Sequence, residues 1–270
     1  MWTKELFGTE KPIIAMLHLI ALPGDPNYDP QGGMGKVIER ARRELHVLQN
    51  GGVDAIMFSN EFSLPYLFDV APCTVAAMAA VIGELKAEIK IPFGVDVLTD
   101  SYKVFDLAAA VEAKFVRGMF TGAFAGEFGL MSFEIGKVVR HRAAVGARGI
   151  KTLFTLHPEA SKALVDRPVE DIVKALAFYG EPDAILVAGL IAGHAADSHL
   201  IGRVKAAAAG KIPVFANTGV RLENVDAQLA AGDGAVVGTT FKRDGAFYNE
   251  ADEARVKAFM DKVKSIRGGS

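Results

Sequence analysis

Short aliphatic segments alternate with longer segments of helical periodicity along the whole chain, and this alternation constrains the fold more than any other feature. The aliphatic segments span three to six residues, and eight of them can be counted. Continuous apolar runs of this kind are typical of parallel strands that are buried on both faces. The expected strands are residues 13–18, 55–59, 93–98, 115–118, 152–155, 184–187, 214–216 and 235–237.

The intervening segments are rich in Ala, Glu and Lys and repeat with a helical period. The expected helices are residues 36–50, 74–89, 104–112, 133–145, 168–179, 198–208, 225–230 and 252–266. Eight strand–helix units without a flexible linker predict an α/β fold in which a single (β/α)₈ TIM barrel occupies residues 1–270. Residues 1–11 would be an N-terminal extension, and residues 267–270 a disordered tail.

Charge and motifs limit the class of partner. The chain has 30 Lys and Arg residues against 32 Asp and Glu residues, a balance that argues against nucleic-acid binding and favours a small molecule. Neither G-x-G-x-x-G nor G-x-x-x-x-G-K-[ST] occurs, so no nucleotide cofactor is expected. Barrels of this size often pair through their outer surfaces, so we expect a homo-oligomer.

A reducing, cytoplasmic location is expected from the cysteine content and the N-terminal segment. The single cysteine, Cys73, cannot form an intramolecular disulfide, and we expect a small, buried or half-buried side chain there. The N-terminus lacks a secretory signal, and the apolar stretch 13–22 is too short to span a membrane.

The last two expected strands end in small and hydroxylic residues. In a TIM barrel the loops after strands seven and eight commonly bind a phosphate through backbone N–H groups. The predicted phosphate-binding and substrate-binding residues are Asn60, Asn217, Thr218, Gly219, Gly238, Thr239 and Lys242.

Five titratable residues at strand ends are candidates for chemistry, because the active sites of such barrels lie at the carboxyl ends of the strands. They are His18, Glu61, Asp96, Arg117 and His157. Each has a structural alternative: Arg117 could pair with Asp96, and His18 could simply be hydrogen-bonded in the barrel mouth. His157 precedes a proline, and Glu159 could orient its ring. His194 and His199 lack the spacing of a helical metal pair, although a divalent metal held by several loops is an open alternative.

Several of these motifs together resemble the BtpA/SgcQ family. The opening strand runs into a His-Leu and then a Leu-Pro-Gly turn, as in that family, and the likeness continues over nearly the whole chain. The segments that carry it are Ile14-Ala-Met-Leu-His18-Leu-Ile-Ala-Leu-Pro-Gly24, Gly52-Val-Asp-Ala-Ile-Met57 with Asn60, Ile91-Pro-Phe-Gly-Val95 with Asp96, Phe115-Val-Arg117 with Thr121-Gly122, Asn217-Thr-Gly219 and Gly238-Thr-Thr-Phe-Lys242.

The resemblance implies a barrel similar to phosphoribosylanthranilate isomerase. One branch of the family is associated with photosystem I biogenesis, and others are found among carbohydrate-metabolism genes. That photosystem branch tends to carry a Lys-His pair at the end of its fifth strand, where this chain has Leu156-His157. A Schiff-base mechanism would need an amine there, and Lys242 is the nearest substitute.

Two functions from different classes therefore remain. The first is an enzyme that acts on a small phosphorylated sugar or polyol derivative by proton transfer next to a carbonyl, as an isomerase, an epimerase or an aldolase-type lyase. The second is a non-catalytic assembly factor related to the photosystem I proteins. The assembly function predicts an exposed apolar patch, and none is obvious in the sequence.

Overall fold

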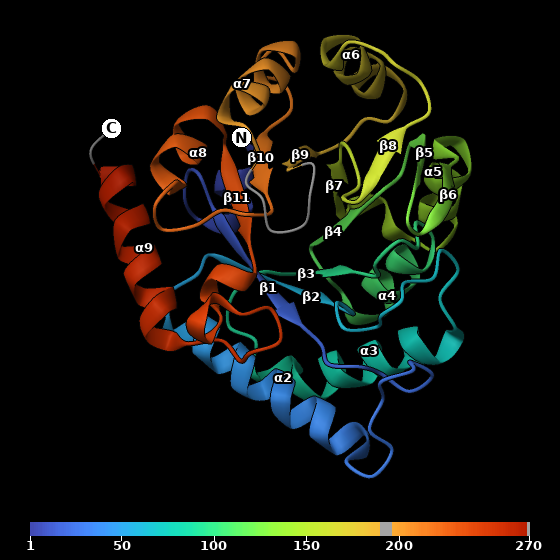
Figure 1. Cartoon of the computed structure of the whole chain (residues 1–270), viewed down its shortest axis with the longest axis vertical. Coiled ribbons are helices and arrows are strands. Elements are labelled where there is room, and N and C mark those ends of the chain that lie inside the picture. Colours follow the sequence, from blue (N-terminus) through green and yellow to red (C-terminus); the bar gives the residue numbers. More distant parts are fainter. Residues whose placement is uncertain (190–195, 269–270) are drawn as a thin grey trace.

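The computed structural model describes residues 1–189 and 196–268, and in it eight parallel strands close into a barrel with helices around it (Figure 1). The expected TIM-barrel fold is confirmed. In order around the barrel, the strands are β1 (Ile13–His18), β2 (Ala55–Ser59), β3 (Phe93–Asp96), β4 (Phe115–Gly118), β7 (Lys151–Thr155), β9 (Ala184–Ala188), β10 (Val214–Asn217) and β11 (Gly234–Val237), which pairs with β1.

The helices follow the expected segments closely, with one addition at the N-terminus. They are α1 (Trp2–Phe7), α2 (Gly33–Asn50), α3 (Pro72–Leu85), α4 (Lys103–Val111), α5 (Ile135–Ala144), α6 (Val169–Tyr179), α7 (Ser198–Ala207), α8 (Val225–Ala231) and α9 (Glu253–Gly268). Short 3₁₀ turns are η1 (Lys86–Glu88), η2 (Ala147–Gly149), η3 (Thr239–Phe241) and η4 (Arg243–Gly245).

The barrel strands are largely apolar, as expected of strands with both faces buried. Alternate residues point into the barrel, where Met57, Phe115 and Phe215 belong to one cluster, while the residues between them pack against the surrounding helices. Phe7 of α1 joins the interior cluster and packs edge-on against Phe115, at 5.6 Å between ring centroids. Helix α1, in the expected N-terminal extension, therefore packs against the inner core of the barrel.

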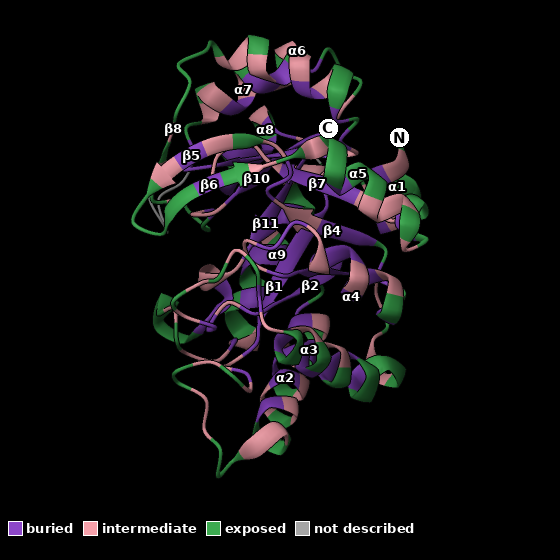
Figure 2. Ribbon diagram, turned by 90° about the vertical axis from the view of Figure 1, so that its right-hand side faces the viewer, coloured by how far each residue is buried: buried purple, intermediate pink, exposed green. Residues whose placement is uncertain are grey.

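A separate three-stranded antiparallel sheet was not expected from the sequence. It consists of β6 (Gly129–Phe133), β5 (Gly122–Gly126) and β8 (Ser161–Ala163), in that order, and comes from the loops after β4 and β7. Strands β5 and β6 contain glycines, which are depleted in strands, so the sequence pattern did not predict a sheet here. A side chain at Gly126 would approach the carbonyl oxygen of Ala160 to 2.1 Å, so only glycine allows β5 and β8 to pair here. Figure 2 shows exposed residues on this sheet and buried residues along the barrel strands.

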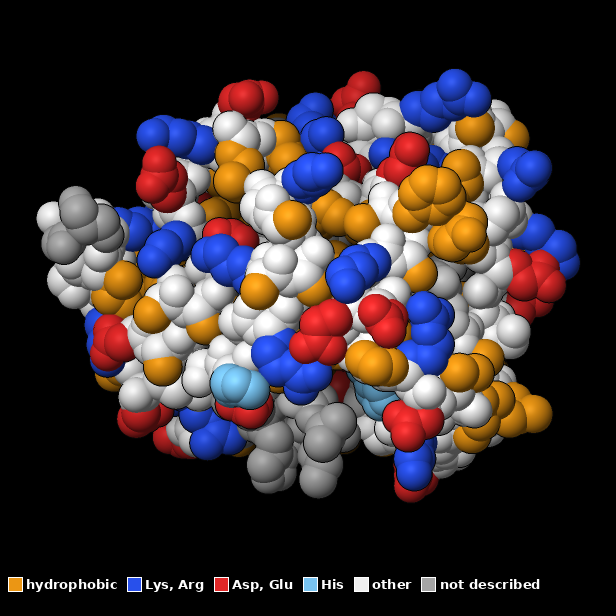
Figure 3. Space-filling model, turned by 90° about the horizontal axis from the view of Figure 1, so that it is seen from above, with side chains coloured by type: hydrophobic (Ala, Val, Ile, Leu, Met, Phe, Trp, Pro, Cys, Tyr) orange, Lys and Arg blue, Asp and Glu red, His pale blue; other side chains and the backbone are white. Residues whose placement is uncertain are grey.

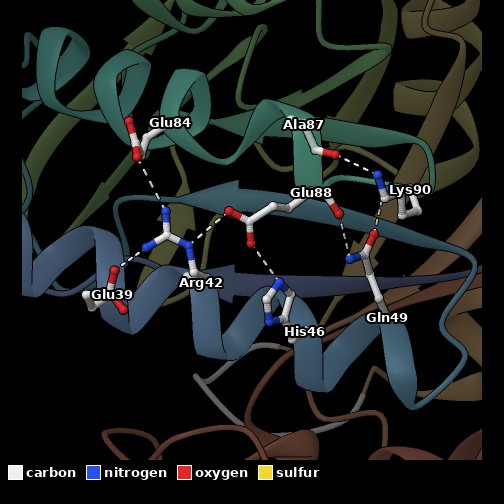
Figure 4. A network of polar contacts seen from close by, with 8 residues as sticks. All are labelled: Glu39, Arg42, His46, Gln49, Glu84, Ala87, Glu88 and Lys90. Carbon is white, nitrogen blue, oxygen red and sulfur yellow. Dashed lines mark hydrogen bonds and ion pairs between the residues drawn. The ribbon is translucent and has the colours of Figure 1, made fainter.

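An ion-pair network joins α2 to the end of α3 and to η1 (Figure 4). Arg42 donates to Glu88 at 2.9 Å and lies 3.5 Å from Glu84, while His46 contacts the second oxygen of Glu88 at 2.7 Å. Gln49 adds a hydrogen bond to the backbone carbonyl of Glu88. The hydrogen bond from Arg42, together with the bond from His46, lowers the pKa of the Glu88 carboxyl.

Two expectations about single residues were wrong. Cys73 is exposed, because it lies in the first turn of α3 and not in the core. Arg267 is not part of a disordered tail: it lies in the last turn of α9 and forms an ion pair with Asp54 at 2.5 Å. Residues 269 and 270 lie outside the described part of the chain.

The surface carries both signs of charge. Around α6 and α7, Lys and Arg side chains are interspersed with Asp and Glu side chains (Figure 3). Within residues 1–189 and 196–268, no helix is both long enough and apolar enough to span a membrane.

Candidate functional site

The inward-pointing residues at the carboxyl ends of the barrel strands form a ring. The strand register pairs His18 with Ser59 and Ser59 with Asp96, and it places Arg117 beside Asp96. These residues continue the alternation of the interior cluster, so their side chains face the barrel mouth. The ring consists of His18, Ser59, Asp96, Arg117, Thr155, Ala188, Asn217 and Gly238.

Arg117 and Asp96 form a buried ion pair at the centre of this ring. Nε and Nη2 of Arg117 each lie 2.5 Å from Oδ2 of Asp96, and Nη1 donates to Oδ1 of Asn217 at 3.3 Å. Burial raises the pKa of Asp96, and Arg117 offsets part of that rise. Burial acts to lower the pKa of Arg117, but the charges of Asp96 and Glu61 raise it by more. The net shift is upward, so the guanidinium stays charged. The pairing suggested as the structural alternative is thus present.

Glu61 and His18 lie next to this pair. Oε2 of Glu61 accepts a hydrogen bond from the Ser59 hydroxyl at 3.0 Å and is 3.7 Å from Nε2 of His18. The His18 ring is 5 % exposed, and its Nδ1 has no hydrogen-bond partner among the described residues. Burial, with the charges of Lys242 and Arg117, lowers the pKa of His18 well below its ordinary value. His18 is therefore neutral at pH 7 and does not balance the charge of Glu61.

Aromatic side chains enclose the His18 ring. Phe62 and Phe247 have ring centroids 5.9 Å and 5.8 Å from it, and they lie 5.1 Å from one another. Phe247 comes from the loop after β11, so that loop reaches across to the ends of β1 and β2. The apolar wall explains why burial is the main cause of the low pKa of His18.

Tyr66 is a site residue that the sequence analysis missed. Its hydroxyl donates to the backbone carbonyl of Glu61 at 3.0 Å, and its ring lies 5.6 Å from that of Phe128. Burial, and then the charge of Glu61, raise the pKa of the phenol above its ordinary value, so Tyr66 remains a neutral donor. No motif marks it, because it follows the strand end by seven residues in an irregular loop.

Glu159, in the segment after β7, contacts the loop after β10. Its carboxyl accepts a hydrogen bond from the Thr218 hydroxyl, and burial raises its pKa. The sequence left open that Glu159 orients His157, but the ring makes other contacts: Nδ1 of His157 is 2.8 Å from the carbonyl of Pro158, and the ring packs on Phe124. His157 is held by its own loop and by the added sheet.

Several backbone N–H groups in the loops after β10 and β11 have no hydrogen-bond acceptor among the described residues. Thr218 and Gly219 have left-handed backbone conformations, with φ of 70° and 66°. The N–H groups of Gly219, Val220, Gly238, Thr239 and Thr240 have no acceptor within the described ranges. The Thr240 hydroxyl donates to the carbonyl of Val220 at 2.6 Å, which holds the two loops together. We call these five N–H groups the amide cradle. Such groupings bind small anions.

Two residues expected to bind substrate have other contacts. Lys242 is 1 % exposed; its Nζ donates to the carbonyl of Asn249 at 3.1 Å and lies 4.0 Å from Glu44 on α2. It thus joins the loop after β11 to α2, and its ammonium is buried. Asn60 is also buried, and its Oδ1 accepts from the N–H of Leu98, which fixes the loop after β3.

The sequence left open a metal site held by several loops and did not predict one from His194 and His199. His194 lies outside the described residues, and His199 is in the first turn of α7, where Asp197 caps the helix. In residues 1–189 and 196–268, no group of three or more His, Cys, Asp or Glu side chains is arranged to hold a metal ion.

The sequence of this barrel matches one family over almost its entire length. The model of the BtpA family covers residues 9–265. The chain belongs to the BtpA family. The resemblance seen in the sequence motifs is therefore confirmed, and it extends over the strands that carry His18, Asp96, Arg117 and Asn217.

Two relatives within the BtpA family differ in their sequence identity to this chain. The sgc region protein SgcQ of Escherichia coli (strain K12) is 54 % identical over 98 % of this chain and 99 % of its own length. The photosystem I biogenesis protein BtpA of Synechocystis sp. is 29 % identical over 95 % of this chain and 89 % of its own.

Among solved structures, phosphoribosyl anthranilate isomerase from Thermus thermophilus superimposes with a TM-score of 0.56. The likeness covers 95 % of this BtpA-family chain and 100 % of that structure, at 14 % sequence identity. At this identity the likeness concerns the TIM-barrel fold alone, since this fold hosts many unrelated reactions.

Proposed function

We propose that this protein is an enzyme that binds a small phosphorylated sugar or polyol derivative and moves a proton next to its carbonyl group. The observation that carries the proposal is the amide cradle at the ends of β10 and β11, which lies in the same mouth as Arg117 and three carboxyl groups. Anion binding at this place in a TIM barrel leaves the rest of a small substrate over the ring of strand ends.

Glu61 is the proposed base. Asp96 is held by Arg117, and His157 is held by Pro158, whereas the Glu61 carboxylate has only a serine hydroxyl as a hydrogen-bond donor among the described residues. It is 18 % exposed, so a substrate can reach it. A carboxylate at hydrogen-bond distance from an acidic C–H can remove that proton.

Arg117 and Tyr66 are the proposed groups that stabilise negative charge on the carbonyl oxygen. The guanidinium is fixed by Asp96 and Asn217, so it is oriented before the substrate binds. Tyr66 stays protonated, and its hydroxyl would turn from the Glu61 carbonyl to donate its single proton to the substrate oxygen. Neither Leu156, which packs against the core, nor the buried Lys242 offers an amine to the mouth, so proton transfer without a Schiff base is the proposed route. Isomerisation, epimerisation and aldol-type cleavage all share this proton transfer.

The test begins with binding. Thermal stability is measured with a panel of sugar phosphates, the corresponding free sugars and inorganic phosphate, because a specific ligand raises stability in proportion to RT ln(1 + [L]/Kd). Thr239→Asp places negative charge at the cradle, and Thr239→Ser is its control. Phosphates should stabilise the parent protein and the serine variant but not the aspartate variant. An equal response from all three proteins would overturn the phosphate assignment.

Catalysis is tested separately by proton NMR in D₂O. A sugar phosphate that binds should exchange the hydrogen next to its carbonyl for deuterium, and Glu61→Gln should abolish the exchange while leaving phosphate binding intact. If sugar phosphates bind to the parent protein but none of them exchanges this hydrogen, the enzyme assignment is contradicted.

The assembly-factor function is kept as a second candidate because of the added sheet. Leu130 and Leu164 are 75 % and 57 % exposed, and the strand register places both on the outer face of the sheet of β5, β6 and β8. An apolar face of this kind is one that a protein partner can cover. If Leu130→Ser with Leu164→Ser abolished co-purification of a defined partner and the D₂O assay showed no exchange, this candidate would be favoured.

A further inference from the structure

The mouth of the barrel contains more negative charge than its cations balance. Arg117 contacts Asp96 alone among the three carboxyl groups near it. Glu61 has no Lys or Arg within ion-pair distance in the described residues, and neither does Glu159. The histidine beside Glu61 is neutral, and Lys242 points its ammonium at the Asn249 carbonyl.

Uncompensated carboxylates are costly in a partly buried site. Elsewhere in this chain, buried acids have partners: Glu44 is bonded by Arg40 at 3.0 Å, and Asp54 by Arg267 at 2.5 Å. Glu61 and Glu159, which both interact electrostatically with Arg117 at the mouth, have no such ion pair among the described residues. Their position indicates that the balancing charge arrives with the ligand.

Two further observations point to a ligand in the same place. The first is the amide cradle, whose five N–H groups have no acceptor within the described ranges. The second is Nδ1 of His18, a buried ring nitrogen with no hydrogen-bond partner in the part of the chain that the structure describes. The His18 ring is also close to the cradle: a side chain on Gly238 would come within 3.2 Å of its Nε2. The mouth therefore combines a site for an anion with an adjacent site for a cation.

We propose that the natural substrate is a phosphorylated amino sugar or amino polyol, whose phosphate occupies the amide cradle and whose protonated amine lies between Glu61 and Glu159. This inference rests on the proposed function, because it needs the phosphate at the cradle. A divalent metal bound with a neutral sugar phosphate would bring the same charge. The amine is favoured because the described residues offer no three-ligand metal group, whereas an ammonium needs only hydrogen-bond acceptors such as two carboxylates.

The test compares ligands that differ only at the nitrogen. Calorimetric titrations at about pH 6 use inorganic phosphate, glucose 6-phosphate, glucosamine 6-phosphate and N-acetylglucosamine 6-phosphate, each with metal-stripped protein and again with Mn²⁺. We expect glucosamine 6-phosphate to bind at least about tenfold more tightly than glucose 6-phosphate. The acetylated compound carries no charge at nitrogen and should lose this preference.

Variants and pH locate the preference. Glu61→Gln should reduce the ratio between the amino and the neutral sugar phosphate toward one, while the affinity for inorganic phosphate stays within about twofold. Raising the pH to about 9.5 deprotonates an amine of this kind and should have the same effect on the ratio. Glu170→Gln, on the exposed surface where Glu170 pairs with Arg203, is the control and should leave the ratio unchanged.

The outcomes separate the two proposals. If inorganic phosphate and every sugar phosphate fail to bind, the proposed function itself is wrong. If phosphates bind but the amino and neutral sugars bind equally, the amine assignment is overturned and the phosphate assignment stands. If the amino and the neutral sugar phosphates bind equally, and bind tightly only when Mn²⁺ is present, a metal ion and not an amine supplies the positive charge.

Discussion

The Thr218 hydroxyl donates a hydrogen bond to the Glu159 carboxyl, and this contact joins the loop after β10 to the segment after β7. It also places an ionisable acid at the edge of the amide cradle. Burial raises the pKa of Glu159, so the carboxyl takes up a proton at a higher pH than an exposed glutamate does. A phosphate bound at the cradle would raise that pKa further through repulsion of like charges.

Phosphate binding should therefore depend on the protonation of Glu159. We expect Glu159→Gln to tighten inorganic phosphate binding at pH 7 by about tenfold and to remove the part of the affinity that falls as pH rises through the pKa of this group. Titration calorimetry between about pH 5 and pH 8 measures both effects. Parallel pH profiles for the parent and variant would contradict the proposed link. Glutamine can still accept from Thr218, so the loops should stay joined.

Removing the charge of Asp96 should destabilise the barrel mouth. Asp96→Asn leaves the buried Arg117 without its ion-pair partner, and breaking a buried pair from one side costs about 3 kcal/mol. Urea denaturation of the parent, of Asp96→Asn and of the exposed control Asp166→Asn measures the difference. A change as small as that of the control would mean that Glu61 and Glu159 already balance Arg117.

Gly238→Ala tests the packing of His18 against the last strand. The added methyl group would lie 3.1 Å from Cε1 of His18, so the ring must shift within its aromatic enclosure. We expect a lower melting temperature and a displaced NMR signal for the His18 Cε1–H. Gly35→Ala is the matched change in α2, where the new methyl group meets no atom within 4 Å; it should instead stabilise the protein by about 1 kcal/mol. Similar effects of the two changes would argue against close packing at Gly238.

Lys242→Met tests whether this lysine binds phosphate or only stabilises the loop after β11. Because the ammonium is bonded to the Asn249 carbonyl behind the loop, its removal should leave inorganic phosphate affinity within about twofold. Stability should fall, since Glu44 loses one of its cations. A tenfold loss of phosphate affinity, with the fold intact by circular dichroism, would show that Lys242 contributes to phosphate binding after all.

The Arg42 network should contribute to the acid sensitivity of the protein (Figure 4). The pKa of Glu88 is lower in the folded than in the unfolded chain, so its stabilising effect is present above about pH 4.3 and is lost as pH falls through the folded pKa. Glu88→Gln should flatten the acid limb of a stability–pH curve obtained by thermal denaturation. The exposed Glu223→Gln should not, and an unchanged limb in both variants would show that the network is too exposed to matter.

The sequence alone determined the barrel and the end of the barrel at which the candidate site residues lie. Eight apolar runs with intervening helical periods leave few ways to bury both faces of every strand, and alternation then places His18, Asp96, Arg117 and Asn217 at the mouth. These features follow from local patterns, which is why strand ends could be found within a few residues.

Tertiary structure alone decided which of those polar groups meet. The glycine-rich sheet of β5, β6 and β8 forms only because separate loops pair, and Tyr66 enters the site from an irregular loop. Lys242 follows a strand end, as a phosphate-binding residue would, yet the loop after β11 turns its ammonium toward Asn249 and Glu44. Such contacts join residues far apart in sequence, and their partners are set by loop conformation and burial, which no local pattern encodes.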